Sequence, residues 1–513
     1  MTPGQSALRD RYRGQRIFLT GASGLVGQAV LEKILRALPD VGEVLLFLRP
    51  HGRTTAEDRL PEILRSPLFD RLRRERPDFD AWWPTKVSAV AGGLGLPRLG
   101  LTREDWTELA SRVTAIIHAG ALAAFDEPID RVLDVNTCGS LDVLELARDA
   151  GNVPLVHVST CYVCGNAPGT HGETVMPWGH TPRTLADGTD PVFDPEAELG
   201  ALLERCERIR LDVTAGLPAD ERLRRLGVRV ADRHGWPNPY PMSKAWAEQL
   251  LVRRRGSVPL SIVRPAIVES TLSEPEPGWL TGLRMTDPLI VAMGRALLDV
   301  FPGDRDKVID LVPCDLVVNA ILAALPERGP DAGPRVYQVA GSAKTPLTLG
   351  RFHDLCRTAL VAEPFRDPEG VPIIPGHMEL VDPPRFLRTV SRRRRALTRE
   401  AAAAARSGRE AKRRAARTSG RFLRYALRLG RTYAPYTVSA LRFTTDNLDR
   451  LERSLSDADR ALFPMDVARV DWRHYVQHVH VPAVRREAGE GGAAAAAAAP
   501  AQEVRRAQGA GPA

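Results

Sequence analysis

The sequence predicts an α/β fold, a doubly wound parallel sheet followed by a smaller, mostly helical C-terminal domain. Three observations support this prediction. An apolar run near the N-terminus leads through a glycine-rich turn into a helix, further apolar runs alternate with helical stretches, and short mixed elements replace this pattern after residue 340. Doubly wound sheets bind ligands outside the carboxyl ends of their strands, so the residues after each run are the first candidates for a site.

Six apolar runs are expected to form buried strands. They cover residues 16–20, 41–50, 87–92, 115–120, 155–160 and 261–268. The helix after the first run is expected from Val26 to Leu38. Residues 1–340 would then form one domain built on this sheet.

A long segment interrupts this domain at residues 165–235. It is rich in Pro, Gly and charged residues, with one helical stretch at 196–215. An insertion of this length is either a lid or wall of a substrate site, or a plain solvated excursion.

The C-terminal part is expected to form a second domain over residues 341–485, with a compact helical piece at 436–480. Inside this domain, residues 386–432 are rich in Arg and Ala and are expected to be partly helical. The tail, 486–513, carries an alanine run and scattered glycines and is expected to be disordered.

Composition indicates an ordinary globular protein, with 43% hydrophobic and 26% charged residues in 513. There is no apolar run long enough for a transmembrane helix and no secretory signal, so a cytoplasmic protein is expected. The six cysteines suggest no disulfide framework. Cys161 and Cys164 form a CxxC that lacks the second ligand pair zinc needs, so we expect packing roles and no metal site.

Positive charge is concentrated in one segment. Between residues 391 and 431, 15 Arg or Lys face 2 Glu, a local charge of +13 that leaves −5 for the rest of a chain with net charge +8. This distribution argues against a nucleic-acid-binding body.

The glycine-rich turn has the context of a dinucleotide-binding loop. It reads Thr20-Gly21-Ala22-Ser23-Gly24-Leu25-Val26-Gly27 and joins a strand to a helix. Gly21 permits the tight turn, Gly24 lets the backbone approach a pyrophosphate at the helix N-terminus, and Gly27 allows close helix–strand packing. The alternative is an ordinary strand–turn–helix.

The end of the second run indicates which dinucleotide binds. An acidic residue there would accept from the 2′-hydroxyl of NAD, but this run ends in Arg49, with Arg53 nearby. A guanidinium suits a 2′-phosphate through bidentate hydrogen bonds. We therefore predict NADP(H); the alternative is that Arg49 is a solvated cation.

Tyr240 and Lys244 form the candidate catalytic pair. Their spacing of four places both on one face of a helix. A cationic lysine beside a phenol favours the phenolate and lowers the phenol pKa, so that the pair can exchange a proton with a carbonyl oxygen.

A third partner is expected where the fifth run ends. Thr160 would hydrogen-bond the substrate oxygen, and Ser159 is the alternative, because alternation lets only one of them face the site. Asn136 is a candidate for a proton relay or, equally, for a structural role inside a helix.

Longer stretches support a more specific comparison. In the first domain they are Phe18–Gly27, Leu48–Pro50, Ile117–Ala121, Phe125–Glu127, His157–Tyr162, Asn238–Glu248, Arg264–Val268, Glu274–Trp279, Asp310–Asp315, Asn319 and Val336–Val339. In the C-terminal part they are Phe443, Asn447, Phe463, Asp466, Asp471, Trp472 and Tyr475. Together they resemble the extended short-chain dehydrogenase/reductase superfamily and, within it, the fatty acyl-CoA reductases, over nearly the whole chain.

The resemblance implies a Rossmann-like domain with NADPH as cofactor. It implies reduction of a long-chain fatty acyl-CoA to the aldehyde, with release of CoA, and then to the primary alcohol. Ala119, Pro265 and Ile267 would line the cofactor site, and Lys244 would also bind the nicotinamide ribose. The alternatives are an enzyme that stops at aldehyde, or one acting on fatty aldehydes or acyl carrier protein thioesters.

The sequence departs from the family pattern in two places. Gly92-Gly93-Leu94 replaces the usual Gly-Asp-Leu, which removes a carboxylate expected near the adenine. The basic segment 386–432 stands near the position where eukaryotic members often carry an apolar anchor. This segment is a solvated linker, a peripheral attachment to anionic lipid, or a docking site for a carrier protein or CoA phosphates. The sequence predicts no acyl chain length and no oligomeric state.

Overall fold

The computed structural model describes residues 7–190, 193–212, 214, 216–325, 333–367, 369–407 and 410–490. The chain divides into two compact units whose segments are interleaved in sequence. The first unit comprises Met1–Trp279, Leu311–Lys344 and Leu441–Arg469, and the second comprises Leu280–Asp310, Thr345–Ala440 and Val470–Ala513. Among the helices in the described ranges, none combines the length and apolar character needed to cross a bilayer.

The first unit is built on a seven-stranded parallel sheet. Its strands, in spatial order, are β3 (Val87–Ala91), β2 (Glu43–Leu48), β1 (Arg16–Thr20), β4 (Ala115–His118), β5 (Leu155–Val158), β7 (Leu260–Pro265) and β11 (Arg335–Val339). The strand order reverses between β1 and β4, which is where such sheets bind ligands. The predicted doubly wound sheet is confirmed.

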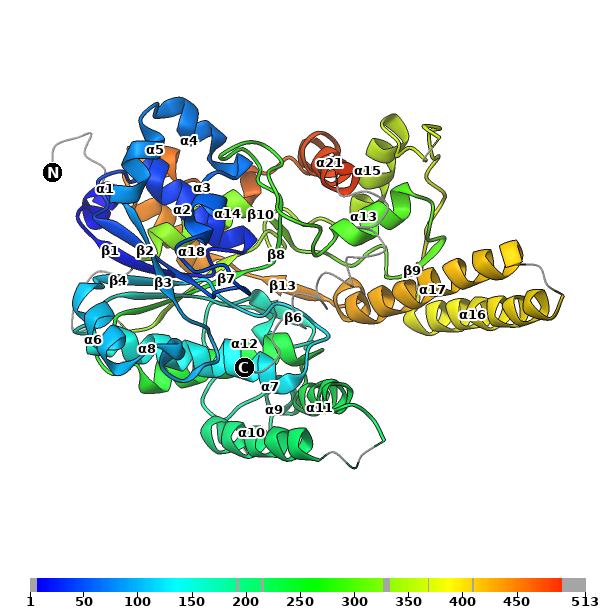
Figure 1. Ribbon diagram of the computed structural model, residues 1–513, viewed down its shortest axis with the longest axis horizontal. Coiled ribbons are helices and arrows are strands. Elements are labelled where there is room, and N and C mark those ends of the chain that lie inside the picture. Colours follow the sequence, from blue (N-terminus) through cyan, green and yellow to red (C-terminus); the bar gives the residue numbers. More distant parts are fainter. Residues whose placement is uncertain are drawn as a thin grey trace. The chain divides into compact units, whose positions relative to one another are not determined.

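Helices cover both faces of this sheet (Figure 1). One layer contains α2 (Leu25–Ala37), α14 (Cys314–Ala323) and α18 (Asp446–Ser454), and the other contains α6 (Arg103–Arg112), α8 (Gly139–Asp149) and α12 (Pro239–Arg254). Shorter helices complete the unit: α1 (Ala7–Tyr12), α3 (Arg59–Leu64), α4 (Asp70–Glu75), α5 (Phe79–Trp82), α7 (Ile129–Leu133), α9 (Pro182–Asp187) and α19 (Asp457–Leu462).

The strand expected at 261–268 is wrong, because it divides into two. After Pro265, the backbone N–H of Ala266 still donates to Val339 O at 3.0 Å. The chain then leaves the main sheet, and β8 (Ile267–Glu269) pairs with β10 (Leu311–Pro313) in a separate two-stranded sheet. Proline has no N–H to continue a ladder, which suits the end of a strand.

The insertion contains more structure than the single helix expected from its sequence. It forms β6 (Gly169–His171), α9, α10 (Pro195–Leu211) and α11 (Ala219–His234). Apolar side chains of α10 and α11, including Leu202 and Leu226, join one buried cluster with Trp246 of α12. The insertion is therefore part of the core around α12, and the interpretation as a solvated excursion is wrong.

Residues 441–469 complete the first unit. The strand β13 (Leu441–Phe443) pairs with β6 of the insertion, and the carboxylate of Glu173 accepts backbone N–H groups from the start of α18, at Asn447 and Leu448. The same carboxylate accepts from Gln338 N on the edge strand β11 at 2.7 Å. One buried carboxylate thus joins the insertion, the sheet edge and a helix N-terminus, where negative charge is stabilised.

The second unit is mainly helical. Its elements are α13 (Asp287–Gly294), α15 (Leu349–Ala362), α16 (Pro383–Arg406), α17 (Glu410–Thr437), α20 (Trp472–His474), the π-helical turn η7 (Tyr475–His480), α21 (Val481–Glu490) and the pair β9 (Val300–Pro302) and β12 (Glu379–Val381). Residues 486–490, expected to begin a disordered tail, lie in α21, so that boundary is wrong; 491–513 are outside the described residues.

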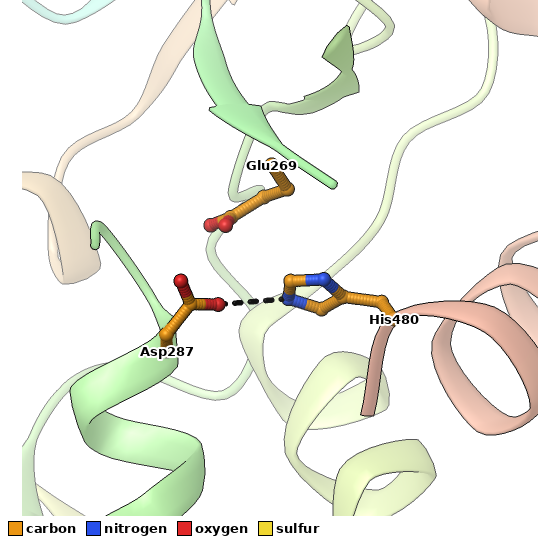
Figure 2. A group of neighbouring side chains, drawn as sticks. All are labelled: Glu269, Asp287 and His480. Carbon is orange, nitrogen blue, oxygen red and sulfur yellow. Dashed lines mark ion pairs between the residues drawn. The ribbon is translucent and has the colours of Figure 1, made fainter. Parts of the chain in front are cut away.

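A buried acid–base pair ties two helical elements of this unit together. Asp287 at the start of α13 and His480 at the end of η7 point toward one another, with Asp287 Oδ1 3.4 Å from His480 Nε2 (Figure 2). Burial raises the pKa of Asp287 to about 7 and lowers that of His480 to about 3. Burial therefore favours the uncharged form of both side chains in this interior.

Candidate active site

The glycine loop is closed by backbone contacts that exclude side chains. Gly21 adopts φ +79°, and a Cβ there would lie 2.6 Å from the carbonyl carbon of Ala119. A Cβ at Gly27 would lie 2.2 Å from Gly21 O, whereas one at Gly24 would make only ordinary contact, at 3.4 Å. Gly21 and Gly27 therefore fix the turn, and Gly24 leaves space beside it.

The loop delivers a helix N-terminus to the carboxyl ends of β1 and β4. Gly24 is the N-cap of α2 and has no side chain to accept the first helical N–H groups. Ser23 is exposed, and Leu25 and Val26 are half-buried at the first turn. Free N–H groups and the helix dipole make this position suitable for a phosphate.

Thr20 joins this loop to the one after β4. Its hydroxyl accepts the N–H of Gly120 at 3.0 Å and bonds His118 Nδ1 at 2.7 Å, so that Ala119 is held between them. The sequence patterns predicted no site role for His118, although a polar residue inside an apolar run is informative.

Arg49 follows the last residue of β2 and is exposed. Its carbonyl oxygen accepts a bond of 2.8 Å from Arg59 Nη1, which fixes the backbone there. The guanidinium is thus carried at the carboxyl edge of the strand next to β1, and its predicted contact with a 2′-phosphate stays a prediction.

The pair Tyr240 and Lys244 occupies the first turns of α12. Asn238 caps this helix by accepting Tyr240 N at 3.0 Å, and Pro239 follows it at the first helical position, so the sequence dictates where the helix starts. The Tyr240 ring is half-buried and meets Phe125 edge to face at 6.2 Å. Lys244 is fully buried.

The electrostatics of this pair differ from the sequence expectation. Burial raises the pKa of Tyr240 to about 12, and burial lowers the pKa of Lys244 to about 7, partly offset by the carboxylate of Glu248. The prediction that a lysine cation lowers the tyrosine pKa is wrong for the chain alone. The reason is that burial of the Tyr240 phenol disfavours its charged phenolate form.

Lys244 Nζ contacts His157 Nε2 at 3.2 Å. His157 lies on β5, is fully buried, and its pKa is held well below the usual value by burial and by Lys244. A neutral imidazole can accept from an ammonium through one ring nitrogen, so His157 is positioned to hold Lys244. No local sequence pattern predicts a site role for His157.

A second polar chain connects the sheet to the same helix. His118 Nε2 lies 3.0 Å from Ser140 Oγ, which in turn donates to the backbone oxygen of Asn136 at 2.6 Å. The Asn136 side chain accepts from Leu122 N at 2.7 Å and donates to Ser243 Oγ at 3.0 Å. These bonds give Asn136 a structural role beside Lys244, while the relay hypothesis stays a prediction.

Thr160 and Ser159 follow β5, and both are buried. The Thr160 hydroxyl accepts from Tyr162 N at 3.3 Å and caps a short 3-10 turn at Cys161–Cys164. Ser159 Oγ is buried without a hydrogen-bond partner among the described side chains and backbone. Both hydroxyls therefore stay available as candidate donors to a substrate oxygen.

Buried groups behind the site keep its frame fixed. Pro265 ends β7 and Ile267 begins β8, both at the carboxyl edge of the sheet. Next to them, Arg264 Nε donates to Glu248 Oε1 at 2.9 Å in a bidentate, fully buried ion pair that the sequence analysis missed. The six cysteines all lie in the described ranges, and none of them forms a disulfide. Burial raises the pKa of Cys164 to about 12, so this residue is not an activated thiol.

Comparison with known proteins identifies the family. Two family models, both described as male sterility protein, match residues 19–321 and 411–488. Fatty acyl-CoA reductase 1 of Arabidopsis thaliana is 31% identical over 485 residues, covering 91% of this chain and 96% of that protein. The chain belongs to the fatty acyl-CoA reductase family. Fatty acyl-CoA reductase 1 of Mus musculus is 28% identical over 502 residues, covering 92% of this chain and 84% of that protein.

Solved structures support the fold of this family member. The terminal R domain from the myxalamid PKS-NRPS biosynthetic pathway has a TM-score of 0.56 at 18% identity, covering 91% of this chain and 90% of that one. The reductase (R) domain of a nonribosomal peptide synthetase from Mycobacterium tuberculosis has a TM-score of 0.54 at 18% identity, covering 94% and 95%. A nicotinamide cofactor is consistent with this fold and with the loop geometry.

Substitutions in the glycine loop should separate folding from cofactor binding. In Gly27→Ala, the Cβ would lie 2.2 Å from a backbone oxygen that cannot move freely, so the free energy of unfolding should fall by about 1–3 kcal/mol. Gly24→Ala should fold normally but weaken dinucleotide binding by roughly tenfold or more. Thermal unfolding and dinucleotide titration measure the two effects. Unchanged binding in Gly24→Ala would contradict the assigned approach of the pyrophosphate.

The contact between His157 and Lys244 should be visible in a pH profile. Since the Lys244 pKa is about 7, kcat/KM should fall above about pH 7 as the ammonium is lost. His157→Leu removes the hydrogen-bond acceptor, so this alkaline limb should move to lower pH. His157→Gln retains an acceptor oxygen and should restore it. If both variants show the same apparent pKa as wild type, then His157 only packs against Lys244.

Proposed function

We propose that this chain is an NADPH-dependent reductase that converts a long-chain fatty acyl-CoA to the fatty aldehyde and on to the primary alcohol, releasing CoA. The observation that carries the proposal is the family membership over more than nine-tenths of the chain, joined to a glycine loop and a tyrosine–lysine helix at one sheet edge. Family members in Arabidopsis thaliana and Mus musculus bear the name fatty acyl-CoA reductase.

When bound, NADPH would supply the hydride that the thioester carbonyl carbon accepts. The glycine cradle fits such a group, because Gly24 leaves space at a helix N-terminus that a phosphate can use. Arg49 would hold a 2′-phosphate, and Lys244 would hold the nicotinamide ribose.

The chain's own groups act on the substrate oxygen. With its pKa raised to about 12, Tyr240 stays protonated at neutral pH and can donate to the oxygen as negative charge develops. Thr160 would be the second donor. Collapse of the hemithioacetal then breaks the C–S bond, giving aldehyde and the thiol of CoA, and a second reduction of the aldehyde uses the same donors.

The two cysteines that follow β5, Cys161 and Cys164, favour direct reduction over a covalent acyl-enzyme. Cys161, near Thr160, is buried and bonded to the Arg264 carbonyl oxygen at 3.0 Å, and burial raises the pKa of Cys164. A thiol with a raised pKa is a poor nucleophile at neutral pH. The thioester is therefore proposed to accept hydride without first being transferred to the protein.

Cofactor choice should depend on Arg49. Arg49→Ala should lower kcat/KM with NADPH by about 10- to 100-fold, because a charge-assisted bond to a phosphate contributes about 1.5–3 kcal/mol, and should change kcat/KM with NADH little. Arg65→Ala, an exposed arginine at the end of α3, is the matched control. An enzyme that prefers NADH, or equal losses with both cofactors, would refute the assignment.

Tyr240→Phe should lose turnover by about 10²- to 10⁴-fold, since the ring remains in place against Phe125 while the proton donor is removed. Dinucleotide affinity should be retained, which titration of the same variant checks. Near-normal turnover would remove Tyr240 from the mechanism.

Product analysis of the wild-type enzyme with a long-chain acyl-CoA and excess NADPH tests the full reaction. Accumulating primary alcohol supports the proposal. Accumulating aldehyde would favour the alternative enzyme that stops at the first reduction.

A further inference from the structure

One face of α16 carries a row of arginines. The helix contains eight arginines and a single acidic residue, Glu400, between residues 383 and 406. Five of the arginines recur at spacings of four, three, four and seven, which places them on one helical face. These exposed residues, called the arginine row, are Arg388, Arg392, Arg395, Arg399 and Arg406.

The opposite face of α16 is already used for packing. Phe386 and Val390 form a buried cluster with Leu423 and Leu427 of α17, and Figure 1 shows the two long helices side by side. A Cβ at Gly430 would lie 2.2 Å from the Phe386 ring, so the helices pack closely there. The apolar residues of 422–429 therefore pack between the two helices. The surface of the hairpin that carries the arginine row is cationic.

The arginine row is not neutralised by its own helix hairpin. Two other arginines of α16 have carboxylate partners, Arg385 with Glu379 and Arg393 with Asp299. Among the side chains that the structure describes, no carboxylate pairs with any arginine of the row. Its charges are thus free to meet an external anion.

We propose that the arginine row is a docking surface for the phosphate groups of an anionic lipid bilayer. From Arg388 to Arg406 the row covers 18 residue steps, about 27 Å at 1.5 Å per residue, which is far longer than one phosphate requires. Guanidinium groups bind phosphate through bidentate bonds. Because the apolar face is packed away, attachment is electrostatic, reversible and sensitive to salt. The inference rests on the proposed function only in that a long-chain acyl substrate and its alcohol partition into membranes.

Sedimentation of the full chain with vesicles tests this surface. Wild type should bind phosphatidylcholine vesicles that contain about one-third phosphatidylserine, should not bind pure phosphatidylcholine, and should be released by high salt. The variant R388Q/R392Q/R395Q/R399Q should partition about 10²- to 10³-fold more weakly, at about 1 kcal/mol for each cation.

A charge-matched control removes four exposed arginines from the insertion helices, R205Q/R208Q/R225Q/R229Q. It should bind anionic vesicles close to the wild-type level. Equal binding by the row variant and wild type, equal loss in the control, or wild-type binding to neutral vesicles would each overturn the proposal.

Two further measurements distinguish lipid docking from the proposed function and from docking of a carrier protein. Turnover of a long-chain acyl-CoA in the absence of vesicles should be the same in the row variant and in wild type. If wild type shows no turnover in this assay, the proposed function fails while the vesicle result still stands. Row-dependent binding of an acidic carrier protein, without vesicle binding, would assign the row to a protein partner and overturn the lipid assignment.

Discussion

The burial of α12 is the constraint on which the rest of the site depends. A helix that carries a lysine, a glutamate and a glutamine in its interior is stable only if each finds a partner, because a lone buried charge is costly. Lys244 meets His157, Glu248 pairs with Arg264, and Gln249 bonds the backbone of the insertion at Gly179 and His180. These partners come from β5, β7 and the insertion, so the helix fixes where three parts of the first unit must lie.

The same burial determines the protonation states of Tyr240 and Lys244 in the chain without cofactor. Desolvation lowers the proton affinity of Lys244 and raises that of Tyr240, so at neutral pH the phenol holds its proton. A group at the cofactor position that supplied hydrogen-bond acceptors to the ammonium would favour the charged lysine. Under the proposed function, cofactor binding and proton donation by Tyr240 would be coupled through Lys244.

Sequence patterns sufficed for the features that rest on local rules. The glycine loop, the parallel strands and the helical face shared by Tyr240 and Lys244 follow from backbone sterics and residue periodicity, which neighbouring residues determine. The features that the sequence did not predict depend on long-range contacts. The run at 261–268 divides because β10, more than 40 residues later, offers a second partner. The insertion helices pair with α12 through Leu202 and Leu226, and the ends of the His157–Lys244 contact lie 87 residues apart.

The hydrogen bonds that the Glu173 carboxylate accepts from Asn447 and Gln338 have a consequence for biosynthesis. Its three partners lie 165 to 275 residues downstream, so the carboxylate is desolvated only after the ribosome has delivered α18. At about 5–20 residues per second, that delay is roughly 14–55 s. The insertion, which is synthesised first, passes through this interval with its Glu173 contacts unmade, and partly assembled states of this kind are prone to aggregation.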